Sequence, residues 1–326
     1  MSKFFHGGNI MDNLIIYCDD LQEGMWFQEL NDLFENAELR IIPTSAKHIE
    51  NEGLTEVLKY DRPDIILKHN GQVIFILERT VEVPSGHNVG QRFGRLVAAA
   101  QLRIPVVYFG PYAAYKHGGA TAGPRYMNLR LFSALQAMSK LFGTAITTIN
   151  WPVDQKYEII KQPCKDNRIK EYLNLFLSYY VSNGMNSINQ YIMSSQFQRE
   201  QITEQERFAH NEVRNPEQYD GPPDSVEILP ISLFLSKYQL PKALFNGAND
   251  IVLYNVGMTY VRSDPYAGMS ALYKYLYNVN STSGRILVLA FPHITIEMWK
   301  NLRKSRKDYR MFKEFSDAII SVSYTH

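Results

Sequence analysis

Residues Pro63 to Thr80 read PDIILKHNGQVIFILERT, which is the clearest local pattern in the chain. Two β-branched and aliphatic runs, Ile65–Lys68 and Val73–Leu77, are separated by His69-Asn70-Gly71. Runs of this composition favour strands, and an Asn-Gly pair between two such runs is a strong short-range signal of a β-hairpin. The stretch therefore predicts two antiparallel strands joined by a tight turn.

The segments on either side of the hairpin extend it into an α/β domain. After it, Asn88–Arg103 places apolar side chains on one helical stripe, and Val106–Phe109 is typical of a buried strand. Before it, Leu39–Ile42 is expected as a strand, and helices are expected over Leu21–Phe34 and near Ile49–Leu58. This alternation predicts an α/β fold with a mixed central sheet flanked by helices.

The rest of the chain is less regular. Tyr112–Arg125 is rich in Gly, Ala and Tyr, which favours an ordered loop, and Asn167–Gln198 has the apolar spacing of one or two helices. Pro and Gly cluster in Asp220-Gly221-Pro222-Pro223, which marks the best domain boundary. We therefore expect an α/β core over residues 1–150, a helical middle region over 151–219 and a C-terminal α/β region over 220–326.

Composition narrows the class of protein. Of the 326 residues 45% are hydrophobic and 21% are charged, and no apolar run reaches the ~18 residues of a membrane span. The first twenty residues do not resemble a secretory signal, so the expected location is the cytoplasm, with no membrane partner. Cys18 and Cys164 lie far apart without a Cys/His cluster, which suggests neither a disulfide framework nor a zinc site. With 34 basic and 33 acidic residues, any nucleic-acid contact must be local.

The two ends of the predicted hairpin carry carboxylates. Asp64 opens the first strand and Glu78 closes the second, so antiparallel pairing brings both to the same end. Thr80 lies on the same face as Glu78, whereas Arg79 points the other way. Carboxylate oxygens suit Mg²⁺, which keeps several waters and so needs only two or three protein ligands. A metal between Asp64 and Glu78 has a further ligand available in the backbone carbonyl of Arg79.

At these residues the sequence resembles the PD-(D/E)XK nuclease superfamily, to which many type II restriction endonucleases belong. Pro63-Asp64 matches the PD element, Glu78 follows 14 residues later, and the order hairpin, helix, strand matches the superfamily's core. The resemblance covers about Glu52 to Pro111. It implies Asp64 and Glu78 as catalytic metal ligands, Mg²⁺ as cofactor and site-specific cutting of double-stranded DNA. Cutting both strands of a short palindrome would call for a homodimer.

One position departs from the superfamily's pattern. The third signature residue, usually Lys, is Thr80, whose hydroxyl can hold the attacking water but offers no positive charge. Lys68, Glu82, Arg92 or a second metal could compensate, and Glu56, on the expected helix before the hairpin, stands where related enzymes often keep an additional acidic ligand. A second hypothesis therefore stays open, namely a catalytically decayed nuclease fold that only binds DNA. A third is action on RNA or branched DNA.

Two further segments are expected to contact DNA. The stretch His87-Asn88-Val89-Gly90-Gln91-Arg92-Phe93 before Ala98-Ala99-Ala100 resembles the segment that often follows the metal motif in restriction endonucleases, and Gln91, Arg92 and Arg95 suit a DNA phosphate. A basic run near the C-terminus is interleaved with Tyr309 and Phe312; it holds Lys300, Arg303, Lys304, Arg306, Lys307, Arg310 and Lys313. We expect Lys304, Arg306 and Lys307 to contact DNA there, in the region assigned to DNA recognition or dimerisation, although a charged helix face is the commoner explanation. Pro223-Asp224 with Glu227 imitates the metal motif, but we discount it because it stands in a proline-rich turn.

Overall fold

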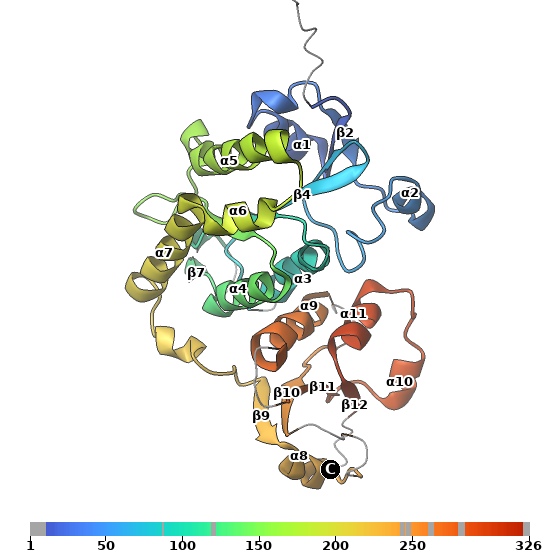
Figure 1. Cartoon of the computed structure of the whole chain (residues 1–326). Helices are drawn as coiled ribbons and strands as arrows, with labels where there is room; N and C mark the ends of the chain where they lie inside the picture. Colours follow the sequence, from blue (N-terminus) through green and yellow to red (C-terminus); the bar gives the residue numbers. More distant parts are fainter. Residues whose placement is uncertain are drawn as a thin grey trace, which may run out of the picture. The chain divides into compact units, whose positions relative to one another are not determined.

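The structure is a computed structural model, and it describes residues 11–86, 88–118, 122–241, 245, 249–259, 264–279 and 284–321 (Figure 1). The chain divides into two compact units. Unit 1 consists of Met1–Val83, Ala98–Arg125 and Ser139–Glu206, and unit 2 of Pro84–Val97, Tyr126–Met138 and Arg207–His326. Chain order alone therefore does not define the units, and the expected three-part functional division stays a prediction.

The centre of unit 1 is a mixed six-stranded sheet in the order β2-β1-β3-β4-β5-β8. Its strands are β1 (Leu14–Cys18), β2 (Glu38–Ile41), β3 (Ile65–His69), β4 (Gln72–Arg79), β5 (Val106–Gly110) and β8 (Ile146–Asn150). Strand β3 is antiparallel to β1 and β4, while the β1–β2, β4–β5 and β5–β8 pairs are parallel. The expected α/β class with a mixed sheet flanked by helices is confirmed.

The β3–β4 hairpin has the turn that the sequence predicts. Asn70 and Gly71 both have positive φ, 49° and 83°, as a two-residue turn that matches the twist of its strands requires. The pairing starts at His69↔Gln72 and reaches Ile65↔Leu77, with a register shift between Leu67 and Lys68. The far end of the hairpin therefore lies where Asp64 and Glu78 were expected to meet.

One face of this sheet carries the core of unit 1. Helices α1 (Leu21–Gln28), α5 (Asn167–Asn183) and α6 (Ile188–Ser194) supply its other half, and Figure 1 shows α1 and α5 side by side. Phe75 of β4 packs against Phe27, Tyr172 and Phe176, with ring centroids 5.4–6.0 Å apart. Rings of this size dominate the burial that stabilises a core, so the hairpin is fixed from this face.

Three local expectations were wrong. The helix expected over Leu21–Phe34 ends at Gln28, because the side chain of Asn31 caps a separate 3₁₀ turn, η1 (Asp32–Phe34). The helix expected near Ile49–Leu58 is α2 (Ala46–Asn51), and Gly53, with φ of 65°, turns the chain just after it. The segment Tyr112–Arg125 is not only a loop, since it contains the paired strands β6 (Ala113–Lys116) and β7 (Gly123–Tyr126).

The remaining elements of the chain complete both units. They are α3 (Asn88–Gln101), α4 (Leu129–Phe142), η2 (Pro163–Asp166), α7 (Gln196–Asn211), η3 (Pro216–Tyr219), β9 (Val226–Pro230), α8 (Ile231–Tyr238), β10 (Asp250–Asn255), α9 (Asp264–Tyr273), the π-helix η5 (Lys274–Val279), β11 (Ile286–Phe291), α10 (Ile296–Lys300), α11 (Lys307–Phe315) and β12 (Ala318–Ser321). Helix α3 and the helical reading of Asn167–Gln198 agree with the sequence. Among the described residues, no helix has the length and apolar character needed to cross a membrane.

Unit 2 is built on a second sheet, in the order β12-β11-β10-β9. Strand β9 is antiparallel to β10, and the other two pairs are parallel. Helix α8 packs on one face through Phe234, whereas Tyr254 of β10 points to the other and packs against Tyr273 of α9, with ring centroids 4.8 Å apart. Helices α9 and α11 lie side by side in Figure 1. The C-terminal region is thus α/β, as expected.

Candidate metal centre at the end of the hairpin

The hairpin brings Asp64 and Glu78 to the same end of the central sheet. The ladder ends with the pair Ile65↔Leu77, so Asp64 and Glu78 are the next cross-strand neighbours. Such neighbours share a face of the sheet, with Cβ atoms about 4.5–5.5 Å apart. Both side chains are buried, with 7% exposure for Asp64 and none for Glu78. The end of the hairpin therefore holds two buried carboxyl groups close to each other.

Backbone groups on both neighbouring strands hold Asp64 in place. The N–H of Arg79 donates to Oδ2 of Asp64 at 2.6 Å, across the end of the hairpin. On the other side, the N–H of Asp19, which follows β1, donates to the carbonyl oxygen of Asp64 at 3.0 Å. A carboxylate that accepts a hydrogen bond from a backbone N–H has its position and its charged form stabilised.

Thr80 lies just past β4, and its hydroxyl is engaged locally. Its N–H donates to the carbonyl of Phe109 at 2.9 Å, which continues the pairing with β5. Its Oγ1 donates to the carbonyl oxygen of Glu82 and accepts from the N–H of the same residue, both at 3.1 Å. Thr80 is thus held on the same face as Glu78, and the donor of its hydroxyl is used by the carbonyl oxygen of Glu82.

Tyr108 is a neighbour of this position that sequence reasoning missed. It is the β5 partner of Glu78 in the parallel ladder and is fully buried. A Cβ on Gly110 would lie 2.9 Å from the Tyr108 hydroxyl and 2.6 Å from Cγ2 of Thr80, so these two side chains approach each other over the glycine. A single apolar run such as Val106–Phe109 does not tell which strand it will pair with, so the sequence carried no signal for this contact.

On the opposite face of β4, Arg79 is enclosed by aromatic rings and a carboxylate. Its guanidinium lies 4.2 Å from the centroid of the Trp26 ring and 5.0 Å from that of Trp151. Its Nη1 forms an ion pair with Oε1 of Glu23 at 3.2 Å, and the two side chains are only 22% and 13% exposed. The expectation that Arg79 points away from Glu78 and Thr80 is therefore confirmed.

Glu23 is a third carboxylate near this end of the sheet. Its pKa is raised from 4.5 to about 7, chiefly by burial and also by the negative charge of Asp64, while Arg79 acts in the opposite direction. Sequence reasoning missed Glu23, although Asp20 and Glu23 have the spacing of a helix capping box. The side chain of Asp20 does accept a hydrogen bond from the N–H of Glu23 at 2.9 Å, so the sequence signal for a helix start at these two residues was present.

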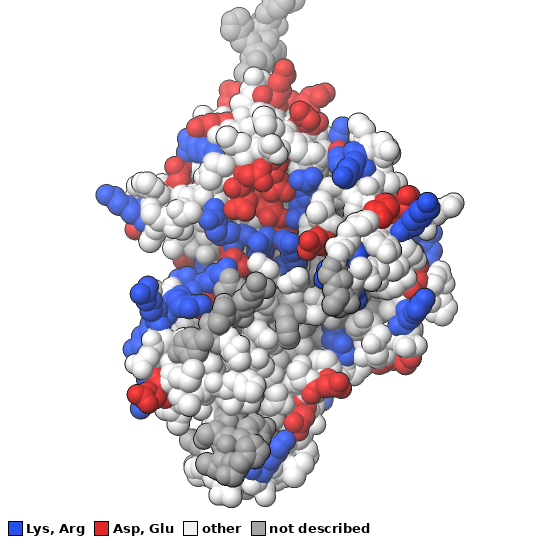
Figure 2. Space-filling view, turned by 180° about the vertical axis from the view of Figure 1, so that it is seen from behind, with Lys and Arg blue, Asp and Glu red and all other residues white. Residues whose placement is uncertain are grey.

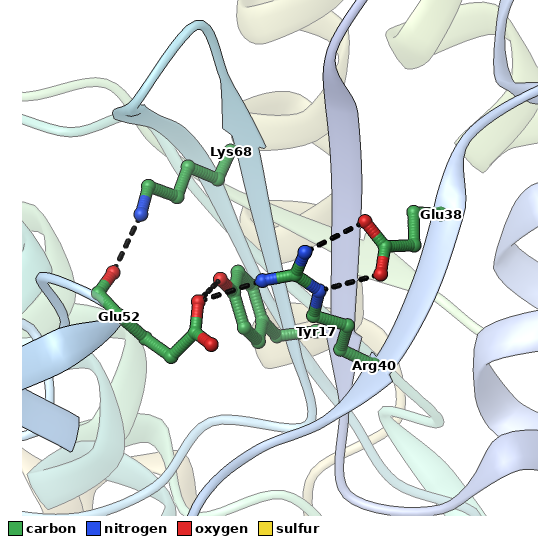
Figure 3. Close-up of polar contacts among 5 residues, drawn as sticks. All are labelled: Tyr17, Glu38, Arg40, Glu52 and Lys68. Carbon is green, nitrogen blue, oxygen red and sulfur yellow. Dashed lines mark hydrogen bonds and ion pairs between the residues drawn. The ribbon is translucent and has the colours of Figure 1, made fainter. Parts of the chain in front are cut away.

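The accessory residues proposed from the sequence are not among the buried side chains at the hairpin end. Glu56 is exposed in a turn and not on a helix, which corrects the expectation for that residue, and Glu82 is also exposed. The Nζ of Lys68 donates to the carbonyl oxygen of Glu52 at 2.5 Å (Figure 3). Lys68 is four residues along the strand from Asp64, about 13 Å at the usual rise. Lys68 is therefore bound to Glu52 and not close to Asp64.

Figure 3 shows that Lys68 belongs to a polar network at the edge of the sheet. The hydroxyl of Tyr17 donates to Oε2 of Glu52 at 2.5 Å, and Arg40 reaches the same carboxylate at 2.8 Å. Arg40 also pairs with Glu38 at 2.7 Å. Because Glu52 caps the end of α2, the network ties this helix to β1, β2 and β3. Its geometry indicates a structural role.

The residues expected to contact DNA are in unit 2. Gln91, Arg92 and Arg95 are partly exposed on α3, within the part of this helix that belongs to unit 2, whereas Asp64 and Glu78 belong to unit 1. A joint site of these residues stays a prediction. His87, the first residue of the polar pattern, lies outside the described residues.

The basic run before and along α11 is accessible. Lys304 and Arg306 are exposed and Lys307 is partly exposed, while Arg306 also pairs with the buried Asp308 at 2.9 Å. On the face shown in Figure 2, basic and acidic side chains are interspersed, with one acidic cluster in the upper half. This mixture agrees with the net charge of +1, and DNA contact by the basic run stays a prediction.

The donor set at the hairpin end fits a hard cation. Two neighbouring carboxylates repel each other, and a divalent cation bound by both would offset that repulsion. Within the described ranges, no group of three or more His, Cys, Asp or Glu side chains is arranged to hold a metal. The cofactor stays a prediction, and Mg²⁺ is the expected ion because it can be held by one or two carboxylates while it keeps several waters.

A surface cavity of about 640 Å³ lies elsewhere in unit 1. It is formed by the segment Glu29 to Leu33 and by α5, from Lys170 to Val181. None of the site residues expected from the sequence lines it.

Comparison with known proteins adds no further assignment. No family model matches the chain, and neither the curated proteins nor the solved structures gave a match.

Proposed function

We propose that this protein is a Mg²⁺-dependent endonuclease of the type II restriction enzyme type, which hydrolyses phosphodiester bonds of double-stranded DNA at specific sites. The observation that carries the proposal is the pair of buried carboxylates, Asp64 and Glu78, as cross-strand neighbours at one end of the β3–β4 hairpin. Hydrolysis of a phosphodiester needs an activated water and relief of phosphate charge. A hard cation bound there would supply both.

The connectivity of unit 1 supports the same proposal. Strands β1, β3 and β4 are antiparallel neighbours, and β5 lies parallel to β4 after the helical crossover through α3. This is the hairpin, helix, strand order that the PD-(D/E)XK resemblance implies, with the PD element before β3 and the acidic residue near the end of β4. Topology alone does not define an activity, so the weight of the proposal rests on the two carboxylates.

The chain's own residues have separate tasks in this proposal. Asp64, fixed by the N–H of Arg79, and Glu78, fixed within β4, are the metal ligands. Thr80 orients the attacking water once its hydroxyl leaves the carbonyl of Glu82. Gln91, Arg92 and Arg95 bind DNA phosphates, and so do Lys304, Arg306 and Lys307. A homodimer would supply one such site to each strand.

The side chain of Thr80 supports an alternative to the endonuclease function. Its neutral hydroxyl is engaged with the backbone of Glu82 and carries no positive charge toward the carboxylates. A protein that had lost the usual lysine could retain the fold and DNA binding without cutting. The second candidate function is therefore a catalytically decayed nuclease-fold protein that binds DNA.

Incubation of the protein with plasmid DNA and Mg²⁺ separates the two candidates. The test compares the wild type with D64A and with D224A, because Pro223-Asp224 repeats the motif's residues at an exposed position of unit 2. Discrete fragments from the wild type and D224A, but not from D64A, support the endonuclease. DNA retention on a gel without cleavage supports the decayed binder. Absence of DNA binding at low salt contradicts both, and cleavage of RNA or branched DNA alone would shift the substrate class.

A further inference from the structure

The side chain of Arg79 sits in an enclosure that the proposed chemistry does not use. Its guanidinium lies 4.2 Å from the centroid of the Trp26 ring and 5.0 Å from that of the Trp151 ring, and it pairs with Glu23 at 3.2 Å. The three partners come from α1 and from the residue after β8, which are distant in sequence from β4. A cation over aromatic rings together with an ion pair is an arrangement that suits Arg better than Lys.

Both rings of this enclosure are themselves fixed. The indole N–H of Trp26 donates to Oδ1 of the buried Asp166 at 3.1 Å, and that of Trp151 donates to the carbonyl oxygen of Ile160 at 2.9 Å. Trp26 also stacks on Phe109 at 6.0 Å, and Phe109 stacks on Trp151 at 4.9 Å. Because both rings are held by their own contacts, they limit the movement of the Arg79 side chain, and this in turn limits the movement of the Arg79 backbone.

The backbone of Arg79 is the point where this restraint meets the carboxylate pair. Its N–H donates to Oδ2 of Asp64 at 2.6 Å, whereas its side chain leaves β4 on the other face. Arg79 is also the last residue of β4, one step beyond Glu78. On the β5 side the pairing continues by one hydrogen bond, from the N–H of Thr80 to Phe109. The end of a strand opens more readily than its middle, so an anchored Arg79 side chain adds to the restraint on this N–H.

We propose that Arg79 is a positioning residue for the metal centre: its side chain, clamped by Glu23, Trp26 and Trp151, fixes the end of β4 so that its N–H holds the carboxylate of Asp64 beside Glu78. The side chain of Arg79 is directed to this clamp and has no task of its own toward the metal or the DNA in the proposal. The inference rests on the proposed metal-dependent function and adds to it the device that orients one ligand. Partners that orient metal ligands commonly change metal affinity by 10–100-fold when they are removed.

The test compares R79M and R79K with R168M as the matched control. Arg168 has the same kinds of contact, since it lies 4.5 Å from the centroid of the Phe197 ring and pairs with Glu171 and Glu200, but it is on α5 and away from the hairpin end. Two quantities are measured: hydrogen–deuterium exchange without metal in peptides spanning residues 78–80, and the affinity for Mn²⁺ by calorimetry. Thermal unfolding of each variant shows how much stability it loses.

In R79M we expect faster exchange at the end of β4 and an Mn²⁺ affinity lower by about 10–100-fold. R79K, which can keep the ion pair with Glu23, should recover part of both, and R168M should change neither even if it melts lower. Wild-type exchange and Mn²⁺ affinity in R79M would overturn the inference, as would equal losses in R168M. A wild type that binds no Mn²⁺ overturns the proposed function. The exchange measurement, made without metal, then still decides whether the clamp holds the strand end.

Discussion

Replacing Gly110 by alanine is expected to disturb the two side chains that face each other beside Glu78. A Cβ at this position would lie 2.6 Å from Cγ2 of Thr80, 2.9 Å from the Tyr108 hydroxyl and 3.2 Å from the carbonyl oxygen of Thr80. Contacts below 3 Å are not tolerated, so the ends of β4 and β5 must separate or both side chains must move.

The expected losses of stability and of cleavage rate follow from the close contacts that the added Cβ would make. Overpacking of a close-packed region costs about 1–3 kcal/mol, so the melting temperature should fall by several degrees. Thr80 is displaced from its place next to Glu78, and a misplacement of about 1 Å is enough to reduce a rate by roughly a hundredfold. The rate of DNA cleavage should therefore fall far more than the small loss of folded protein explains.

Two variants make this expectation specific to the contact. T80S removes Cγ2, the nearest atom, so T80S/G110A should be more stable than G110A, by about 1 kcal/mol in a double-mutant cycle. G257A is the matched control, because a Cβ on Gly257 meets nothing within 4 Å. The measurements are thermal unfolding and cleavage of a labelled duplex. If G110A melts and cuts like the wild type, or if T80S brings no recovery, Gly110 does not hold Thr80 as described.

Three further substitutions test other parts of the molecule. Y17F removes the donor to Glu52 and should destabilise the protein by about 1–2 kcal/mol in urea unfolding. The hydrogen bond from Tyr17 holds the pKa of Glu52 below 4.5, so the advantage of the wild type over Y17F should be complete above pH 4.5 and vanish as the pH falls through that lower pKa; a difference that does not depend on pH would contradict this assignment. T80A should lower the rate of cleavage about tenfold or more while T80S retains most of it, since only the hydroxyl is used; equal rates would exclude Thr80 from catalysis. K304A/K307A should weaken DNA binding at low salt and reduce the slope of log affinity against log salt by about 2; an unchanged slope would remove the basic run from the interface.

The sequence predicted the hairpin well because its signals are local. Asn70-Gly71 determines the turn, and the period-2 geometry of the two strands then places Asp64 and Glu78 on one face without knowledge of any other element. The apolar stripe of α3 and the strand Val106–Phe109 were predicted for the same reason. In each case, the residues that decide the structure are neighbours in the sequence.

The surroundings of the carboxylates were not predictable in the same way. Glu23, Trp26 and Trp151 reach Arg79 from elements up to 72 residues away, and nothing in the local pattern of β4 indicates which partners will enclose its arginine. Helix lengths failed for a related reason. Asn31 and Gly53 redirect the backbone through a side-chain cap and a positive φ, which overrides an apolar pattern that would allow the helix to continue.

The most direct measurement is the rate of Mg²⁺-dependent cleavage of a duplex by E78Q, taken beside its affinity for the same duplex without metal. The amide keeps the shape of Glu78 and removes its charge. E227Q is the matched control. Glu227 is a partly exposed glutamate on a strand, it follows Pro223-Asp224 as Glu78 follows Pro63-Asp64, and it pairs with Lys237. We expect E78Q to bind DNA like the wild type but to cut it at least about a hundredfold more slowly, while E227Q cuts normally. Cleavage by E78Q at the wild-type rate would show that Asp64 and Glu78 do not form the catalytic metal centre.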